Sequence, residues 1–205
     1  MFSILNNKYI AVEGVIGVGK TTLVKKLSMS FSVPYYLEIV EENPFLFKFY
    51  EDMDKWAFQT QLFFLLSRFD QANDIKKTFI QGSGVISDYA FYKDFLFAKL
   101  NLKGDQFDLY KKVFNTLKNQ IMKPDLIVYL YADYETIMNR IALRDRPFER
   151  KIKKEYILSL INEYDNYNKA FSGIKVLRID TTKMDFVKNK VDFEYICNEI
   201  LVNIK

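Results

Sequence analysis

A short glycine-rich segment has the residue types and spacing of a phosphate-binding loop. It contains Gly14-x-x-x-x-Gly19-Lys20-Thr21 with Gly17 inside it, in a chain that has only seven glycines. Glycines let the backbone curl so that successive N–H groups face phosphate oxygens, and the following helix adds the positive end of its dipole. We expect a nucleoside triphosphate here, with Lys20 on the outer phosphates and the Thr21 hydroxyl on Mg²⁺. A glycine-rich turn without a ligand is the alternative.

A second segment, residues 139–151, is rich in arginine. Arg140 and Arg144 are four residues apart on one face of an expected helix, and Arg146 follows at the helix end. Clustered guanidinium groups are costly unless they face water or anions. One interpretation is a solvated basic helix. The other is a lid, about residues 144–152, that supplies positive charge to a phosphoryl group in transfer.

Two carboxylates lie near the ends of expected strands. Glu38 is inside the apolar run 35–40, and Asp88 comes at the end of the run 84–89. Because α/β folds bind ligands at the carboxyl ends of their strands, we expect Glu38 to accept a proton from a hydroxyl nucleophile and Asp88 to hold Mg²⁺ through water. The alternative for each is a carboxylate bonded to nearby backbone N–H groups.

The elements that must position these side chains alternate along the chain. Apolar, β-rich runs predict five strands, and helical patterns lie between them. This order predicts an α/β fold in one domain, residues 1–205, with a five-stranded parallel sheet flanked by helices. The expected strands are 8–14, 35–40, 84–89, 125–132 and 175–180, and the expected helices are 20–31, 54–70, 105–122, 134–143, 153–171 and 190–204.

The composition excludes several classes of protein. There is no histidine, so histidine-based catalysis and histidine metal sites are absent, and the single cysteine cannot form an intrachain disulfide. The net charge of +4 is spread along the chain, unlike the basic stripe of a nucleic-acid binder. No apolar run is long enough to cross a membrane. We expect a cytoplasmic protein that binds neither nucleic acid nor membrane.

Several longer motifs together resemble the deoxyribonucleoside kinases, above all their bacterial deoxyguanosine/deoxyadenosine kinase branch. The resemblance covers nearly the whole chain and implies a P-loop kinase fold. It also implies transfer of the γ-phosphoryl group of ATP to the 5′-hydroxyl of a purine deoxyribonucleoside. The motifs are "GVIGVGKTT", "EIVEENPFLFKFYED", "KWAFQTQLFFLLSRF", "SDYAFYKDFLFAK", "KPDLIVYLYA", "RIALRDRPFE" and "MDFVKNKVDF".

The resemblance also implies roles for single residues. Glu38 matches the base that acts on the 5′-hydroxyl, and Tyr50 and Glu149 match the pair that binds the sugar 3′-hydroxyl. The residues that match base recognition are Gln61 and Arg68, with Asp94 as the partner of the arginine. Those that match the ATP site are Gly14, Gly17, Gly19, Lys20, Thr21, Thr22 and Phe186, and those that match the lid are Arg140, Arg144 and Arg146.

The chain departs from the family pattern at one place. An acid-arginine-serine triplet is common after the third strand, and here the residues are Asp88, Tyr89 and Ala90. The acid is kept, but the cation that replaces the arginine is left open. Two other functions also stay open: a nucleoside monophosphate kinase of the thymidylate type, and a nucleotide-binding subunit without catalysis.

A homodimer is expected from "FYKDFLFAKL", residues 91–100. This segment is apolar on more than one side of an expected helix. A helix whose outer face contacts water needs an apolar surface only on its inner face. The resemblance points to pairing through helices in the same region.

Overall fold

The core of the protein is a five-stranded parallel sheet with the strand order β2-β3-β1-β4-β5. The computed structural model describes residues 5–167 and 173–204. In the centre of the sheet, Ala11 lies beside Ser87 on one side and Ile127 on the other. The predicted parallel sheet is confirmed. Its strands are β1 (Tyr9–Glu13), β2 (Tyr35–Tyr36), β3 (Val85–Ser87), β4 (Leu126–Tyr131) and β5 (Lys175–Asp180).

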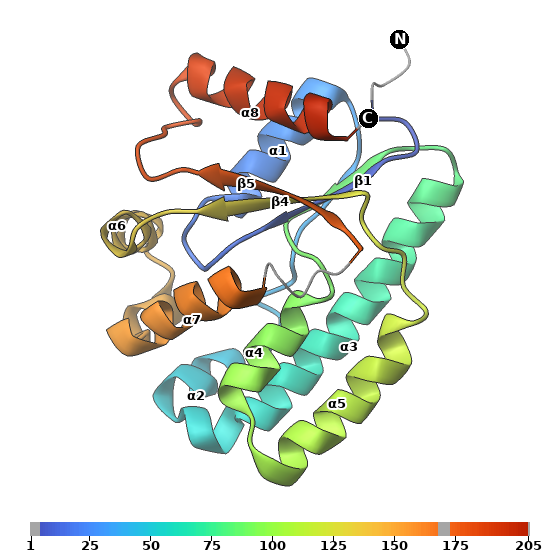
Figure 1. Cartoon of the computed structure of the whole chain (residues 1–205). Coiled ribbons are helices and arrows are strands. Elements are labelled where there is room, and N and C mark those ends of the chain that lie inside the picture. Colours follow the sequence, from blue (N-terminus) through green and yellow to red (C-terminus); the bar gives the residue numbers. More distant parts are fainter. Residues whose placement is uncertain (1–4, 168–172, 205) are drawn as a thin grey trace.

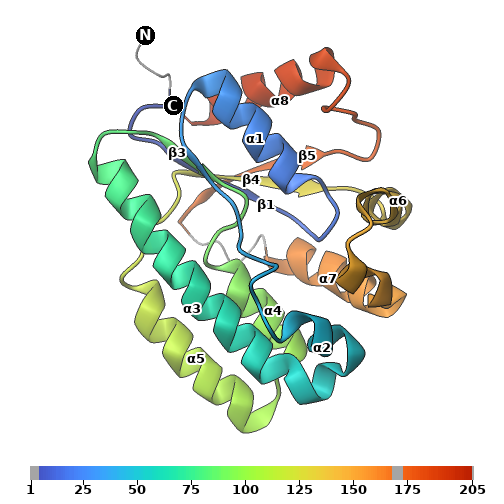
Figure 2. The same ribbon diagram turned by 180° about the vertical axis from the view of Figure 1, so that it is seen from behind.

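Helices cover both faces of the sheet, which is why β1 and β3 are buried along their whole length. One face carries α1 (Lys20–Phe31) and α8 (Lys190–Asn203) (Figures 1 and 2). The other carries α3 (Met53–Ile80), α4 (Lys93–Asn101), α5 (Gly104–Lys118) and α7 (Lys154–Tyr167). The remaining elements are α2 (Leu46–Glu51), α6 (Tyr134–Arg144) and the 3-10 helix η1 (Pro147–Lys151).

Most expected helices are present, with shifted ends. The helix expected over 54–70 continues to Ile80, and that expected over 105–122 stops at Lys118. The helix expected over 153–171 is described to Tyr167, and the rest of its range lies outside the described residues. The sequence pattern missed α2 and η1, because each is too short to show helical periodicity.

The second strand is the main correction to the expected fold. The apolar run 35–40 forms a strand only over Tyr35–Tyr36, so the prediction that Glu38 lies within a strand is wrong. The backbone N–H of Glu38 donates instead to the Asp88 carboxylate, at 2.6 Å. The Asp88 side chain thus accepts the hydrogen bond that a backbone carbonyl of β3 would accept if the strand continued, and Glu38 lies in a loop.

The apolar side chains of α4 are buried or partly buried within this chain. The helix packs against α3, α5 and α7, and its Phe95 ring lies 5.7 Å from Phe107 and 5.2 Å from Phe114 of α5. The apolar character of residues 91–100 therefore has an explanation inside one protomer. It no longer indicates a dimer.

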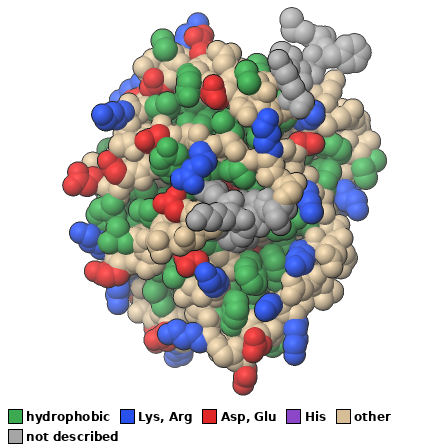
Figure 3. Space-filling view, in the orientation of Figure 1, with side chains coloured by type: hydrophobic (Ala, Val, Ile, Leu, Met, Phe, Trp, Pro, Cys, Tyr) green, Lys and Arg blue, Asp and Glu red, His purple; other side chains and the backbone are tan. Residues whose placement is uncertain are grey.

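Charges of both signs are mixed on the face of the molecule drawn in Figure 3. Over the described part of that face, Lys and Arg side chains alternate with Asp and Glu, with apolar patches between them. No continuous basic stripe runs over this part, although such a stripe is typical of a surface that binds nucleic acid.

Candidate active site

The glycine loop has a backbone that glycine adopts readily and other residues do not. The φ angles of Gly14, Gly17 and Gly19 are +146°, +86° and +107°. A Cβ atom on Gly14 would lie only 2.3 Å from the carbonyl oxygen of Leu130. The loop runs directly into α1, so its N–H groups and the helix N-terminus point to the same anion site.

Lys20 is folded onto this loop. Its Nζ donates to the carbonyl oxygens of Gly14, at 2.8 Å, and Val15, at 3.1 Å. Burial, together with the neighbouring Lys93 ammonium, lowers the pKa of Lys20 to about 8. Phosphate oxygens in place of these carbonyls would stabilise the charged form of the lysine.

Two cavities meet at the glycine loop. The inner cavity, of about 150 Å³, extends to α3, and the outer cleft, of about 600 Å³, lies between α6 and residues 184–188. The residues that line both are Gly17, Lys20, Thr21, Arg144 and Arg146. A group bound in either cavity therefore faces the same cations, which is the arrangement that phosphoryl transfer between two bound molecules requires.

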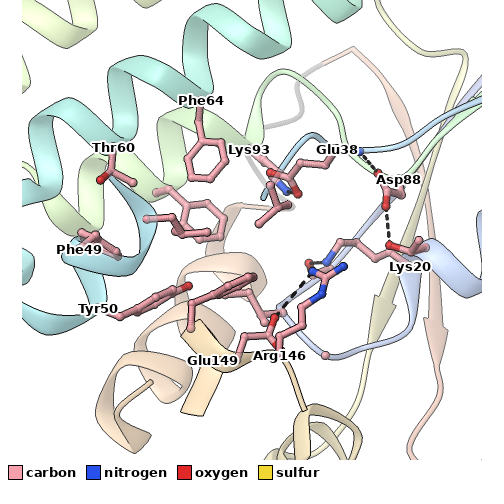
Figure 4. Close-up of a pocket in the computed structure, with 18 of the residues that line it drawn as sticks. Lys20, Glu38, Phe49, Tyr50, Thr60, Phe64, Asp88, Lys93, Arg146 and Glu149 are labelled. Atoms are coloured by element: carbon pink, nitrogen blue, oxygen red, sulfur yellow. Dashed lines mark hydrogen bonds and ion pairs between the residues drawn. The ribbon is translucent and has the colours of Figure 1, made fainter. Parts of the chain in front are cut away.

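Glu38 lies in the inner cavity beside Lys93 (Figure 4), and a second cation, Arg68, contacts its other carboxylate oxygen. Its Oε1 pairs with Arg68 of α3, and its Oε2 accepts from the Lys93 Nζ of α4 at 2.6 Å. Burial alone raises the pKa of Glu38, but Arg68 and Lys93 outweigh it and hold the pKa well below its usual range. Glu38 is therefore ionised at neutral pH, with lone pairs left to accept from a hydroxyl group.

Asp88 links the Glu38 loop to the glycine loop, as the dashed lines in Figure 4 show. Its Oδ1 accepts from the backbone N–H of Glu38, and its Oδ2 accepts from the Thr21 hydroxyl at 2.5 Å. These two hard oxygen donors beside a phosphate loop fit Mg²⁺, which takes few protein ligands and keeps several waters. No cluster of three or more acidic, histidine or cysteine side chains that could hold a metal occurs among the described residues.

Two of the arginines expected in the lid, Arg144 and Arg146, lie beside Glu149 where the two cavities meet. Arg144 pairs with Glu149 through two N–H groups, one of them Nε at 3.1 Å, and Arg146 lies 4.0 Å away from it. Glu149 is buried, and Tyr50 lines the same wall with its ring stacked on Phe148 at 6.3 Å. The structure thus brings together the two residues expected at the sugar, Tyr50 and Glu149.

Two of the expected base-recognition residues, Gln61 and Arg68, line the far end of the inner cavity, and Asp94 lies behind Arg68. Gln61 and Arg68 are buried on α3, and Asp94 of α4 is fully buried beside the Arg68 Nη1 group. The Arg68 guanidinium also lies over the Phe64 ring, 4.7 Å from its centre. Arg68 therefore bridges two carboxylates and is fixed from below by an aromatic ring.

Arg140 and Phe186 belong to the outer cleft only. The Arg140 guanidinium donates to the carbonyl oxygens of Val18, Thr181 and Met184 at 2.7–3.2 Å. The Phe186 ring is buried against the glycine loop, 2.9 Å from the position of a Cβ on Gly19. Arg140 therefore fastens the loop after β5, while the other two lid arginines reach both cavities.

The sequence pattern did not single out two buried charges of the site. Glu13, at the end of β1, accepts from the Ala90 N–H and from the Tyr164 hydroxyl, and burial raises its pKa. Lys93 pairs with Glu38, whereas Tyr89 turns away into an apolar cluster around Ile75. The segment 91–100 carries three charged residues, Lys93, Asp94 and Lys99, so no signal in the sequence distinguishes Lys93 as the lysine of the site.

A family model described as deoxynucleoside kinase matches residues 10–205. The chain is 42% identical to a deoxyguanosine kinase of Bacillus subtilis, over 94% of this chain and 95% of that protein. It is 33% identical to a deoxyadenosine/deoxycytidine kinase of the same organism, over 95% of this chain and 92% of that protein. A deoxyadenosine kinase of Dictyostelium discoideum is 38% identical, over 86% of this chain and 73% of that protein.

Solved structures share the fold. A deoxyadenosine kinase from M. mycoides, solved with dCMP and dCDP, superimposes with a TM-score of 0.82 at 27% identity, over 94% of this chain and 98% of that one. The same kinase with dATP also gives 0.82, at 26% identity and the same coverage.

Proposed function

This chain belongs to the deoxynucleoside kinase family, and we propose that it moves the γ-phosphoryl group of ATP to the 5′-hydroxyl of a purine deoxyribonucleoside. The observation that carries the proposal is the meeting of two cavities at the glycine loop, with Glu38 on the wall of the inner one. The nucleoside occupies the inner cavity and ATP the outer cleft. The chain acts as one kinase domain with its lid at about residues 144–152.

Charge neutralisation is the task of Lys20 and the lid arginines. Phosphoryl transfer passes through a loose transition state with charge spread over the phosphoryl oxygens. Lys20 moves from the Gly14 and Val15 carbonyls to these oxygens, and Arg144 and Arg146 approach from the lid. Thr21 and Asp88 are the residues that would hold Mg²⁺, which neutralises phosphate charge when it is bound. Arg140 supports this arrangement by fastening the loop after β5.

Glu38 takes the proton of the 5′-hydroxyl. The hydroxyl becomes strongly acidic only as its bond to phosphorus forms, so a carboxylate of low pKa can still accept the proton late in the reaction. Tyr50 and Glu149 bind the 3′-hydroxyl on the opposite wall and fix the sugar.

The balance of charges in the inner cavity favours a nucleoside over a nucleoside monophosphate as acceptor. Arg68 is opposed by Glu38 and Asp94, and Arg144 by Glu149. An acceptor that already carries a phosphate needs cations that are not neutralised in this way. Phosphorylation of deoxyguanosine, measured beside that of dGMP with ATP and Mg²⁺, tests the choice. ATP binding without turnover of either acceptor would indicate a non-catalytic subunit.

We expect deoxyguanosine to be the best acceptor, deoxyadenosine the second, and the pyrimidine nucleosides the poorest. Arginine can donate to both O6 and N7 of guanine, and Arg68 uses only part of its five donors on Glu38 and Asp94. Adenine places an amino group where guanine has O6, which costs roughly 1–3 kcal/mol, although Gln61 can recover part of it. The measurement is kcat/KM for four deoxyribonucleosides.

The Arg68→Ala variant separates base recognition from catalysis. It also loses a contact to Glu38, which lowers turnover of every acceptor. The informative quantity is therefore the ratio of kcat/KM between deoxyguanosine and deoxyadenosine, which should fall toward one. A pyrimidine nucleoside ranking first in the wild-type protein would contradict the pocket assignment, and deoxyadenosine ranking first would contradict the role given to Arg68.

We also propose a cytoplasmic homodimer. Among the described residues no helix is long and apolar enough to cross a membrane. Support for the dimer comes from apolar side chains left on the outer helices, since Leu66 and Ile80 of α3 and Leu109 of α5 are exposed. Light scattering at micromolar concentration should give twice the chain mass of 24.4 kDa. A mass of one chain would refute the dimer and leave the kinase proposal intact.

A further inference from the structure

A buried lysine lies against the carboxylate that receives the proton. The Lys93 side chain is only 4% exposed, and its ammonium is 2.6 Å from Glu38 Oε2. Figure 4 shows both side chains in the inner cavity, where Lys93 comes from the first turn of α4. Burial of an ammonium group is costly unless the group is paired with an opposite charge, and Glu38 provides that charge here.

The position of Lys93 answers the question raised by the missing arginine. Tyr89, which stands at the arginine position, is 1% exposed and packs with Ile75 and Val85 away from the inner cavity. It is followed, one helical turn later in sequence, by Lys93, which faces the cavity. In this chain the cation beside the inner cavity therefore comes from Lys93, four residues after the position where the family pattern has an arginine.

We propose that Lys93 is a positioning residue for the reaction, holding the Glu38 carboxylate in the orientation in which it meets the acceptor's 5′-hydroxyl. The inference rests on the proposed function. Arg68 contacts one carboxylate oxygen and Lys93 the other, so the two cations fix the carboxylate plane from two helices. Each oxygen keeps a lone pair for the hydroxyl.

Lys93 differs from Arg68 in what else it does. Arg68 also pairs with Asp94 and belongs to the base end of the cavity. Apart from Glu38, the Lys93 ammonium lies 5.8 Å from the Phe97 ring. Its charge also lowers the pKa values of Lys20 and Glu13, neither of which belongs to the base end of the cavity. Removal of Lys93 should therefore disturb Glu38 while leaving nucleoside recognition in place.

The first experiment uses three variants of the full chain. Lys93→Met keeps the length of the side chain without its charge, and Lys93→Arg restores a cation. Lys99→Met is the matched control, since Lys99 lies on the same helix and pairs with Glu163 at 2.9 Å, but its side chain is 57% exposed. Circular dichroism and the melting temperature establish that each variant is folded.

We expect Lys93→Met to lower kcat by about 10–100-fold, a part of the roughly 10²–10⁴-fold contribution of a positioned base. The Kd of deoxyguanosine should change by less than about threefold, Lys93→Arg should recover most of the lost rate, and Lys99→Met should match the wild type. An unchanged kcat, or a loss confined to Kd, would overturn the inference. If Lys93→Met does not fold, the Lys93→Arg rate decides: it should stay within about tenfold of the wild type.

The second experiment asks whether Lys93 acts through Glu38. In a Glu38→Gln background, the further loss from Lys93→Met should shrink to less than about threefold, because two groups that act as one unit are not additive. A full additional loss in this background would mean that Lys93 acts on the substrate directly and would refute the positioning role. If the wild-type chain turns over no nucleoside, the proposed function itself fails. If the wild-type chain is active and the kcat of Lys93→Met equals that of the wild type, the proposed function stands and only the role of Lys93 is refuted.

Discussion

Replacement of Lys20 by alanine is expected to lower kcat by about 10²–10³-fold, the loss that follows removal of one preorganised charge contact in a transition state. Lys20 lines both cavities, and the carbonyls that now hold its ammonium belong to the glycine loop. The Lys20 ammonium therefore lies between the proposed ATP site and the proposed nucleoside site, along the path of the transferred phosphoryl group. The measurement is steady-state kcat with ATP and deoxyguanosine at saturation.

The fold should survive this substitution. Lys20 is only partly buried and begins α1, whose packing residues are Leu23, Val24 and Leu27. Alanine is also a strong helix former. Lys25→Ala is the matched control, because Lys25 is an exposed lysine of the same helix, and it should behave as the wild type. A Lys20→Ala protein with a near-normal kcat would contradict the assignment of the glycine loop to catalysis.

The glycine loop and the sheet could be predicted because local rules fix them. Three glycines between an apolar run and a helix are typical of a phosphate-binding loop. The strand β4 (Leu126–Tyr131) has only apolar and aromatic residues because helices cover both faces of the sheet. The same rule failed at residues 35–40. That run is apolar enough for a strand, but the Asp88 carboxylate takes the backbone N–H of Glu38 and ends the strand early. Nothing local in the run indicates a partner fifty residues away.

The charged partners of the site depend on tertiary contacts. The pairing of Arg68 with both Glu38 and Asp94 joins α3, α4 and the loop after β2. Periodicity places Gln61 and Arg68 on one helix face, but it cannot tell what faces them. Tyr89 points into the apolar cluster, and Lys93 points into the cavity. Both orientations depend on the packing of α4 against α3, α5 and α7, which the sequence pattern does not reveal.

Replacement of Glu38 by glutamine is expected to lower kcat by about 10²–10⁴-fold, because it removes the proton acceptor and keeps the shape of the side chain. The amide also presents a donor to one of two cations, so Arg68 and Lys93 cannot both keep their contacts. The Glu38→Gln variant therefore loses both the proton acceptor and the contacts that orient this side chain. The Kd of deoxyguanosine, measured by calorimetry, should change little, since the 3′-hydroxyl and the base are bound by other residues of the inner cavity.

The control for this variant comes from the same loop. Glu42 is exposed, and Glu42→Gln removes the same charge four residues away without touching the cavity. Its kcat and KM should equal those of the wild type, which would exclude a general effect of net charge on ATP or nucleoside binding. If Glu38→Gln instead raised the Kd of deoxyguanosine and left kcat unchanged, Glu38 would be a binding residue. In that case the proton would pass to another acidic side chain near the glycine loop, and Asp88, already within hydrogen-bond distance of Thr21, would be the next to replace.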